Sequence, residues 1–403
     1  MLNFLDQEEM SEPKFHIIGI SDSRIPSLSS EAEDVVRNGR FFSGGKRHRE
    51  LIKSHLPEGS EWIDVTVPLA RVFDLYRDKE EIVVFASGDP LFFGYAATLK
   101  REFPESDIKV YPAFNSLQML AHRMLLPYQD MVNVSLTGRP WSNLDPVLIG
   151  GAPLIGILTD RHKTPAEIAR RLIEYNFDYE MTVGENLGNE DKERVTTLAL
   201  SEAACREWDN PNCVILRLQH RARQLFGLPE SDFYHLDGRE KMITKMPVRL
   251  LTLAMLELDG RSSLWDVGFC TGSVSIEARR HYPSINITSF EIREEGRELM
   301  TRNSRKFSAP SITAVTGDFL ELDLTGYPAP DAVFIGGHGG RIDEMLQRVF
   351  DLLLPGGVVV FNSVSASSCE AFRNSVERLG HKITETHTLT IDTHNPITIM
   401  QAR

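Results

Sequence analysis

Apolar runs of strand length alternate with amphipathic, helix-like segments along most of the chain. FHIIGI at 15–20 is followed by EAEDVVRNGR at 31–40, and EIVVFAS at 81–87 is a further apolar run that ends in a Gly-Asp-Pro turn. Such alternation predicts parallel sheets, because a parallel strand needs a crossover that a helix commonly provides. The pattern argues against sandwiches and helix bundles and predicts an α/β fold.

The alternation stops between residues 219 and 238. The segment there, QHRARQLFGLPESDFYHLDG, is polar and interrupted by Gly and Pro, which is typical of a linker. Beyond it, the helix-like PVRLLTLAMLELD and the strand-like SLWDVG begin a second βαβ unit. A chain of 403 residues is long enough for two or three domains. We predict domains at 14–219 and 233–403, joined by a linker at 220–232.

The balance of charge limits the partners of this chain. Asp and Glu total 57 against 44 for Lys and Arg, giving a net charge of -13, whereas proteins that bind nucleic-acid phosphates are usually basic. No apolar run approaches the roughly 20 residues that a membrane-spanning helix needs, and the acidic N-terminal segment is unlike a signal peptide. We therefore expect a cytoplasmic protein that binds neither nucleic acid nor a membrane.

The cysteines indicate neither a zinc site nor a disulfide framework, because no two of them form a CxxC pair and none has a closely spaced His or Cys partner. They are Cys205, Cys213, Cys270 and Cys369. We expect reduced, mostly buried, small apolar side chains and no bound metal.

The most informative motif is LWDVGFCTG at 264–272, an apolar strand that runs into a Gly-x-x-x-Gly turn before a helix. Nineteen residues after Gly272, the next strand ends in Glu291, about where a nucleotide-binding Rossmann unit places an acidic residue for ribose hydroxyls. Asp318 follows the strand TAVTG, where it can reach an adenine edge. Because the full GxGxxG fingerprint is absent, the pattern favours S-adenosylmethionine over NAD. The alternative for the glycines alone is an ordinary strand-to-helix turn.

A second glycine-rich turn, FIGGHGG at 334–340, follows a later strand of the same half. It belongs at the edge where open α/β sheets bind ligands. His338 within it could donate to a substrate carboxylate, and the alternative is a flexible loop with a solvent-facing histidine.

Together with MITKMPVR, FEI, GDF and LPGGVVV, these motifs make the segment from about 233 to 403 resemble the CbiT-like precorrin methyltransferases of cobalamin biosynthesis. The resemblance implies a Rossmann-like, class I S-adenosylmethionine-dependent methyltransferase domain. It implies cofactor contacts by Thr244, Gly268, Phe269, Cys270, Thr271, Gly272, Glu291, Gly317, Asp318 and Phe319. It implies that the tetrapyrrole faces Gly336, Gly337, His338, Gly339 and Gly340. Phe269 and Cys270 replace small residues usual in that family, and His338 stands where Ser is usual.

The first half contains SGDPLFFG at 87–94, followed by YPAFNSLQMLAHRMLLPYQDM, SLTGRP, ILTDRHKTPAEIA and VGENLGNEDKERV. With FFSGGKRHRELI, these motifs make residues 14–219 resemble the tetrapyrrole methylase family, and its CbiE-like members in particular. The resemblance implies a class III methyltransferase fold of two α/β subdomains. It implies cofactor contacts by Gly88, Asp89, Gly94, Ser116 and Thr159.

The loop after the first strand departs from that family. The sequence of this loop is GISDSRIPSLS, in which only Gly19 of the usual glycine-rich loop remains. Ser21, Asp22 and Ser23 are either polar replacements or part of an ordinary surface loop. The departure bears on substrate fit more than on cofactor binding.

Two basic clusters could meet the carboxylates of a corrin precursor in this acidic protein. One is GGKRHRE, with Lys46, Arg47, His48 and Arg49, and the other is GREKMITKMPVR, with Arg239, Lys241, Lys245 and Arg249. From these clusters we assign Lys46, Arg47, Arg49 and Lys245 to substrate binding. The alternative is that both clusters are solvated helix faces.

The two resemblances together imply methylation of precorrin-6Y, or of its cobalt form, at C5 by the first domain and at C15 by the second, with loss of the C12 acetate carboxylate, to give precorrin-8. Methyl transfer from a sulfonium mainly requires that the reactants are aligned and desolvated. We therefore assign no catalytic residue, and we expect a homo-oligomer. The alternatives are a methyltransferase of another substrate such as RNA, a nicotinamide oxidoreductase, and a non-catalytic tetrapyrrole-binding protein.

Overall fold

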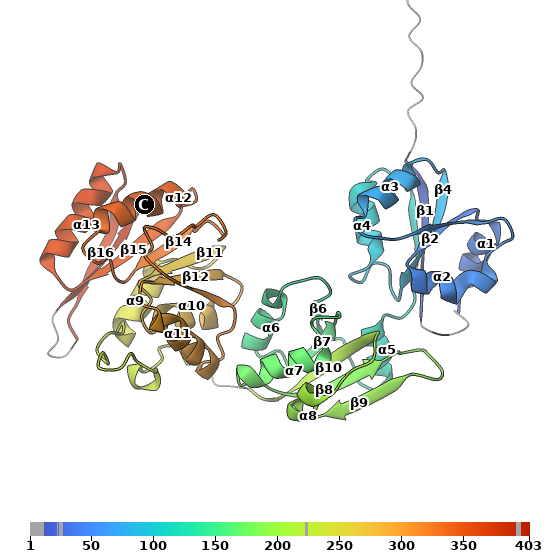
Figure 1. The fold of residues 1–403 in the computed structure, drawn as a ribbon, viewed down its shortest axis with the longest axis horizontal. Coiled ribbons are helices and arrows are strands. Elements are labelled where there is room, and N and C mark those ends of the chain that lie inside the picture. The colour runs from blue at the N-terminus through green and yellow to red at the C-terminus, as the bar shows by residue number, and fades with distance from the viewer. Residues whose placement is uncertain (1–11, 22, 24–26, 222–224, 392–395) are drawn as a thin grey trace, which may run out of the picture. The chain divides into compact units, whose positions relative to one another are not determined.

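The computed structural model describes residues 12–21, 23, 27–221, 225–391 and 396–403. Three sheets make up the fold (Figure 1). The described residues form two compact units. The first unit holds residues up to 138 together with 153–169 and 180–217, and the second holds 139–152, 170–179 and 218–403. The limits that we gave for the domains and the linker remain a prediction.

The first sheet is parallel, as the alternation of strands and helices predicts. Its strand order is β3-β2-β4-β1-β5. The strands are β1 (Lys14–Ile20), β2 (Phe41–Gly44), β3 (Glu61–Asp64), β4 (Glu81–Ser87) and β5 (Ile108–Tyr111). The helices are α1 (Ser30–Asn38), α2 (Lys46–Ile52), α3 (Ala70–Arg77) and α4 (Tyr95–Glu102). Side chains alternate across β1, so Phe15 and Ile17 enter one core and Ile18 and Ile20 the other.

The second sheet is mixed, with the strand order β6-β7-β10-β8-β9. Its strands are β6 (Val132–Ser135), β7 (Leu154–Leu158), β8 (Asp178–Glu185), β9 (Arg194–Leu198) and β10 (Asn212–His220). The nearby helices are α5 (Ser116–Arg123), α6 (Asp145–Ile149), α7 (Pro165–Glu174) and α8 (Leu200–Cys205). Strands β8 and β9 are antiparallel, as are β7 and β10. Our prediction of parallel sheets is wrong for these pairs, and between β8 and β9 the loop is too short for a helical crossover.

The third sheet has the strand order β13-β12-β11-β14-β15-β17-β16. The strands are β11 (Ser263–Val267), β12 (Asn286–Glu291), β13 (Ile312–Thr316), β14 (Ala332–Ile335), β15 (Val358–Ser363), β16 (Ile383–Leu389) and β17 (Ile397–Ala402). The helices are α9 (Met246–Met255), α10 (Ser273–His281), α11 (Glu295–Lys306), α12 (Ile342–Leu352) and α13 (Ala366–Arg378). The first five strands are parallel, whereas β17 is antiparallel to β15 and to β16. The order reverses between β11 and β14, and ligands bind at such a switch point in open α/β sheets.

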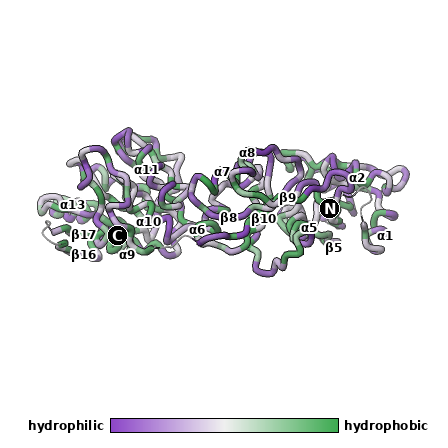
Figure 2. Tube along the Cα trace, turned by 90° about the horizontal axis from the view of Figure 1, so that it is seen from below, coloured by the Kyte–Doolittle hydropathy of each residue, from purple (hydrophilic) through white to green (hydrophobic). Residues whose placement is uncertain are grey.

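Hydrophobic cores cover both faces of the third sheet. Trp265 and Val267 of β11 pack on one face with residues of α12 and α13, and Leu264 packs on the other with residues of α9 and α10. Strands β11 and β14 are buried along their whole length, as two-sided burial requires, and Figure 2 shows hydrophobic and hydrophilic stretches following one another along the chain. This sheet has the Rossmann-like arrangement that we predicted.

A buried ion pair joins helix α9 to helix α10 in the second unit. Arg249 and Glu277 are fully buried, with Nε of the arginine 2.7 Å from Oε2 of the glutamate. Glu277 also accepts the backbone N–H groups of Gly227 at 2.6 Å and Leu228 at 3.2 Å. The expectation that Arg249 belongs to a substrate-binding basic cluster is therefore wrong, because its guanidinium neutralises a buried carboxylate.

Three further findings concern membranes, metals and thiols. No described helix is long and apolar enough to cross a membrane, and the described part of the chain holds no group of His, Cys, Asp and Glu suited to a metal ion.

All four cysteines are free thiols. Only Cys213 is buried, whereas Cys205 is exposed at the end of the short helix α8. The expectation of mostly buried cysteines is therefore wrong.

We predict that Glu277→Gln strongly destabilises the protein. The substitution leaves the Arg249 charge buried without a counter-charge, which costs about 3–5 kcal/mol. Urea unfolding of the full chain measures this loss. Glu50→Gln is the control, because the Glu50–Lys53 pair is exposed and contributes about 0–1 kcal/mol. Equal effects of the two substitutions would contradict the prediction.

Candidate functional sites

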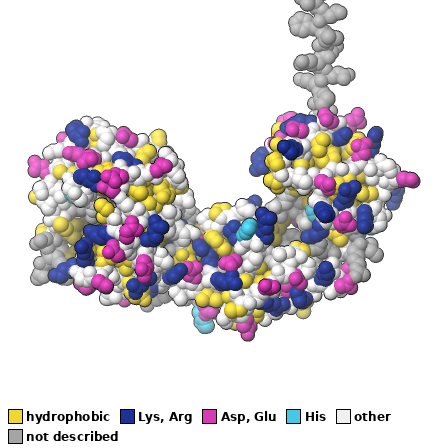
Figure 3. Space-filling view, in the orientation of Figure 1, with side chains coloured by type: hydrophobic (Ala, Val, Ile, Leu, Met, Phe, Trp, Pro, Cys, Tyr) yellow, Lys and Arg dark blue, Asp and Glu magenta, His cyan; other side chains and the backbone are white. Residues whose placement is uncertain are grey.

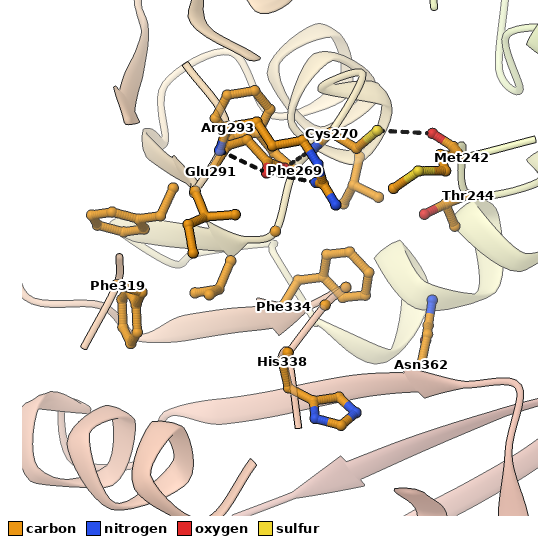
Figure 4. Close-up of a pocket in the computed structure, with 18 of the residues that line it drawn as sticks. Met242, Thr244, Phe269, Cys270, Glu291, Arg293, Phe319, Phe334, His338 and Asn362 are labelled. Carbon is orange, nitrogen blue, oxygen red and sulfur yellow. Dashed lines mark hydrogen bonds and ion pairs between the residues drawn. The ribbon is translucent and has the colours of Figure 1, made fainter. Parts of the chain in front are cut away.

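A cavity of about 430 Å³ opens at the switch point of the third sheet (Figure 4). Most of the residues that we predicted for the second domain line it. They are Thr244, Lys245, Gly268, Phe269, Cys270, Glu291, Gly317, Asp318, Phe319, Gly336, Gly337, His338 and Gly339. Thr271, Gly272 and Gly340 lie outside the lining. Thr271 is buried, and Gly272 caps helix α10 with a φ of +76°.

The glycine turn after β11 lies against the loop after β14. Gly268 has a φ of +82°, and a Cβ there would lie 2.8 Å from the backbone nitrogen of Gly337. Only glycine combines this backbone conformation with so close an approach. The two turns therefore meet at the floor of the cavity and expose backbone to it.

Glu291 lies at the end of β12 with its side chain almost fully buried (2% exposed). Its Oε2 accepts the backbone N–H of Cys270 at 2.9 Å. Its Oε1 accepts two donors of Arg293, the guanidinium Nη1 at 2.7 Å and the backbone N–H at 3.2 Å. The carboxylate points into the cavity but is already engaged (Figure 4). The sequence did not reveal Arg293 as its partner.

Asp318 lies in the turn after β13, as predicted, and its carboxylate pairs with Arg341. That hydrogen bond, together with the backbone N–H of Leu320, lowers the pKa of Asp318. Arg341, the N-cap residue of α12, lines the cavity too, and the sequence analysis did not identify it as a site residue. The adenine-facing position that we predicted for Asp318 is thus shared with a cation.

His338 and Asn362 stand on the side of the cavity formed by β14 and β15. Nδ1 of His338 accepts the backbone N–H of Gly340 at 3.1 Å, so the neutral ring has its proton on Nε2. Burial lowers the pKa of His338, which favours this neutral form. Asn362 donates to Thr252 at 2.9 Å. Sequence reasoning missed Asn362, although its place at the carboxyl end of β15 is a usable signal.

A second cavity, of about 420 Å³, lies in the first unit at the carboxyl ends of β1, β2 and β4. Of the residues that we predicted, Arg47, Gly88, Gly94 and Ser116 line it. Lys46, Arg49, Asp89 and Thr159 lie outside its lining. Sequence reasoning missed its largely apolar wall, which includes Phe85, Phe92, Phe93, Phe114, Met119 and Leu187.

The predicted residues outside this lining have other contacts. Asp89 accepts the backbone N–H of Leu91 at 2.9 Å and so stabilises the turn after β4. Thr159 donates at 2.6 Å to the backbone carbonyl of Asn212, which itself lines the cavity. Neither side chain lines the cavity, but Asp89 stabilises a turn beside it and Thr159 holds one of its lining residues. The guanidinium of Arg49 lies 5.9 Å from the centre of the Trp62 ring.

Gly88 packs directly against the start of α5. Its φ is +62°, and a Cβ there would lie 2.8 Å from Cα of Asn115. A Cβ on Gly19 would likewise lie 2.8 Å from the backbone nitrogen of Ala113 and would also clash with the Gly88 carbonyl. Packing therefore explains why Gly19 is kept in an otherwise altered loop. Asp22 of that loop is outside the described residues, and Ser21 lines the cavity.

His48, which we had counted only as part of a basic cluster, is a neutral wall residue of this cavity. Its Nδ1 accepts the backbone N–H of Gly45 at 3.2 Å, and its Nε2 lies 2.9 Å from Oγ of Ser87. The proton therefore sits on Nε2 and is donated to the serine. Burial, with a smaller effect of the Arg47 charge, lowers the pKa of His48 to about 4.

Comparison with known proteins matches the two halves of the chain to two different family models. The family model described as tetrapyrrole (corrin/porphyrin) methylases matches residues 14–204, and the one described as precorrin methyltransferase domain matches residues 232–402. A precorrin-6Y C(5,15)-methyltransferase (decarboxylating) of Sinorhizobium sp. is 32% identical over 373 residues, covering 91% of this chain and 89% of that protein. A cobalt-precorrin-6B C(15)-methyltransferase (decarboxylating) of Salmonella typhimurium is 37% identical over 134 residues, covering 33% of this chain and 68% of that protein.

A solved structure titled precorrin-6y C5,15-methyltransferase, from Geobacter metallireducens, is 31% identical and has a TM-score of 0.41. It covers 44% of this chain and 97% of its own.

The fold and the matched models define a methyltransferase made of a tetrapyrrole methylase part and a precorrin methyltransferase part. The extent of the identity makes the assignment more specific. The chain belongs to the precorrin-6Y C(5,15)-methyltransferase (decarboxylating) family. The resemblances found in the sequence are confirmed.

We predict that His48 makes the folded protein less stable under mildly acidic conditions. The pKa is near 6.5 in the unfolded chain and about 4 in the folded one, so only the unfolded state binds the proton between these values. Stability should fall by about 1–2 kcal/mol between pH 7 and pH 5 through this group. Urea unfolding at both pH values, compared with His48→Gln, isolates the effect. An identical pH dependence of the variant would contradict it.

Proposed function

We propose that this chain methylates precorrin-6Y, or its cobalt form, at C5 and C15 and removes the C12 acetate carboxylate as carbon dioxide, in cobalamin biosynthesis. The observation that supports this best is the presence of two cavities of cofactor size, each beside a glycine-constrained turn at the carboxyl edge of a sheet. Family membership supports the substrate and the pair of reactions. The product is precorrin-8.

The residues of both cavities fit S-adenosylmethionine. At Gly268 and Gly88 a Cβ would collide with facing backbone, so only glycine fits there and each turn presents backbone, not a side chain, to the cavity. In the second unit, Glu291 would hold the ribose, with Phe269, Gly317, Asp318 and Phe319 around the base and Thr244 at the opposite wall. In the first unit, Gly88, Gly94 and Ser116 would hold the cofactor, with Asp89 and Thr159 behind them. When bound, the cofactor supplies an electrophilic methyl group on sulfur.

The chain's own contribution is alignment and exclusion of water. The apolar wall of the first-unit cavity and the packed turns of the second-unit cavity would desolvate the reactants, which strengthens their electrostatic interactions. Methyl transfer breaks a carbon–sulfur bond and forms a carbon–carbon bond at a ring carbon made electron-rich by the pyrrole nitrogens. Loss of carbon dioxide leaves a carbanion equivalent that the macrocycle delocalises. No described residue is therefore needed as a nucleophile.

The substrate is a polycarboxylate, and the proposal places cations where it would lie. Lys245 lines the cavity of the second unit, and Arg47 lines the cavity of the first unit. The turn of Gly336, Gly337, His338, Gly339 and Gly340 would face the macrocycle with its backbone and with Nε2–H of His338. Lys46 and Arg49, on the exposed side of α2, would meet carboxylates outside the cavity of the first unit. A homo-oligomer remains part of the proposal.

Each chain should bind two molecules of S-adenosylmethionine. Gly268→Val and Gly88→Val should each remove one site, because a side chain at either positive φ collides with facing backbone. Calorimetric stoichiometry checks this, with circular dichroism of each variant as the control for folding. A stoichiometry of one in the parent chain would contradict the two-site proposal.

Glu291→Ala should separate the two methylations. Loss of charge-assisted hydrogen bonds to the ribose should weaken the cofactor about tenfold to a hundredfold at that site alone. With limiting S-adenosylmethionine, C15 methylation should fall while C5 methylation stays near the parent rate. Product mass reports both, and labelled carbon dioxide from the C12 acetate reports decarboxylation.

Decarboxylation should fall with C15 methylation, since the relative from Salmonella typhimurium is named for both reactions and corresponds to only a third of this chain. Gly88→Val is the matched comparison. If that variant abolished carbon dioxide release from a substrate already methylated at C5, while Glu291→Ala left it intact, this assignment would be wrong.

A further inference from the structure

Arg293 lies between the cofactor cavity of the second unit and a neighbouring groove. Its guanidinium holds Glu291 at the cavity edge, at 2.7 Å (Figure 4). The same side chain lines the groove, which has a volume of about 550 Å³ and is formed by residues 235–239 and the first half of α11. The side chain is about one-third exposed. Arg293 therefore borders two open spaces.

The hydrogen-bond acceptors of Glu291 are nearly all occupied by the chain itself. A carboxylate offers about four lone-pair sites. Arg293 fills both sites of Oε1 through Nη1 and its backbone N–H, and Cys270 fills one site of Oε2. One site is left, whereas a ribose presents two hydroxyls. The second hydroxyl can bind only if the guanidinium leaves Oε1, because the two backbone donors are fixed by the fold.

The neighbouring groove offers the displaced guanidinium other carboxylates. Asp237, Glu295 and Glu298 line it together with Arg293. Within the described residues, none of these three carboxylates has an ion pair. Arg302 also lines the groove, but its guanidinium lies over the Tyr234 ring at 4.3 Å.

We propose that Arg293 competes with the cofactor ribose for Glu291 and swings towards the acidic groove when the ribose binds. This inference rests on the proposed function, because it takes Glu291 as the ribose acceptor. S-adenosylmethionine and the product S-adenosylhomocysteine have the same ribose, so Arg293 weakens both. A residue that replaces the product's hydroxyls with its own donors also speeds product release. Arg293 thus sets the affinity of this site.

Arg293→Met tests the competition, since methionine keeps an apolar stem and has no donor. S-adenosylhomocysteine should bind about threefold to tenfold tighter at one of the two sites and unchanged at the other, because a single partly exposed charged contact is removed from the free state. Two-site calorimetry of the full chain at pH 8 measures this. Arg302→Met is the matched control, which should leave both affinities unchanged.

The 2′-deoxy analogue of S-adenosylhomocysteine gives a second readout. In the parent chain it should lose little affinity, because its single hydroxyl uses the free site of Oε2 without displacing Arg293. In Arg293→Met both hydroxyls of the natural ligand find acceptors, so removal of one should cost about tenfold. A parent chain that binds no S-adenosylhomocysteine at this site would refute the proposed cofactor site itself. If the parent binds it and Arg293→Met binds it equally or more weakly, or if both proteins discriminate equally against the deoxy analogue, Arg293 supports Glu291 and does not compete with the ribose.

Discussion

The second unit depends on the contact between two backbone turns at the switch point of its sheet. Gly268 and Gly337 approach so closely that a Cβ on Gly268 would lie 2.8 Å from a backbone nitrogen. This contact brings the ends of β11 and β14 together and leaves the cavity above them. In the first unit, Gly88 packs against Asn115 in the same way, although the sheet is different. In both cavities, close backbone contacts at a glycine fix the turn at the cavity edge, and side chains form the surrounding walls.

The pKa values of the buried carboxylates Glu277 and Asp266 depend on the groups that contact them. Burial alone would raise the pKa of Glu277, but His281 and Arg249 lower it to about 2. Asp266 is also buried, accepts a hydrogen bond from the Ser275 hydroxyl and forms no ion pair among the described residues, and burial raises its pKa to about 7. Glu291 differs from both in its contacts, because its counter-charge, Arg293, is about one-third exposed and also lines a neighbouring groove. Under the competition that we propose, the binding of a ribose at Glu291 depends on this partner.

The sequence was sufficient to predict strands such as β1, β4 and β11 and the glycine turns, because periodicity and glycine spacing are local properties. It could not predict that β8 and β9 are antiparallel, nor that Leu228 belongs to the core of the second unit, because pairing and burial depend on distant residues. The same limit applies to the sites. Glu291 could be placed from the end of its strand, but the contacts of Arg293, Arg341 and His48 come from side-chain directions that a motif does not encode.

Charge is divided within the cavity of the second unit in a way that suits one cofactor and one anionic substrate. Arg293 and Arg341 pair with Glu291 and Asp318, so the cofactor half is close to neutral. Lys241 and Lys245 also line the cavity, and among the described residues neither forms an ion pair. On the visible face of the molecule, cations and carboxylates are interspersed (Figure 3). Under the proposed function, these two lysines would attract a polycarboxylate by local charge, even though the chain as a whole has a net charge of -13.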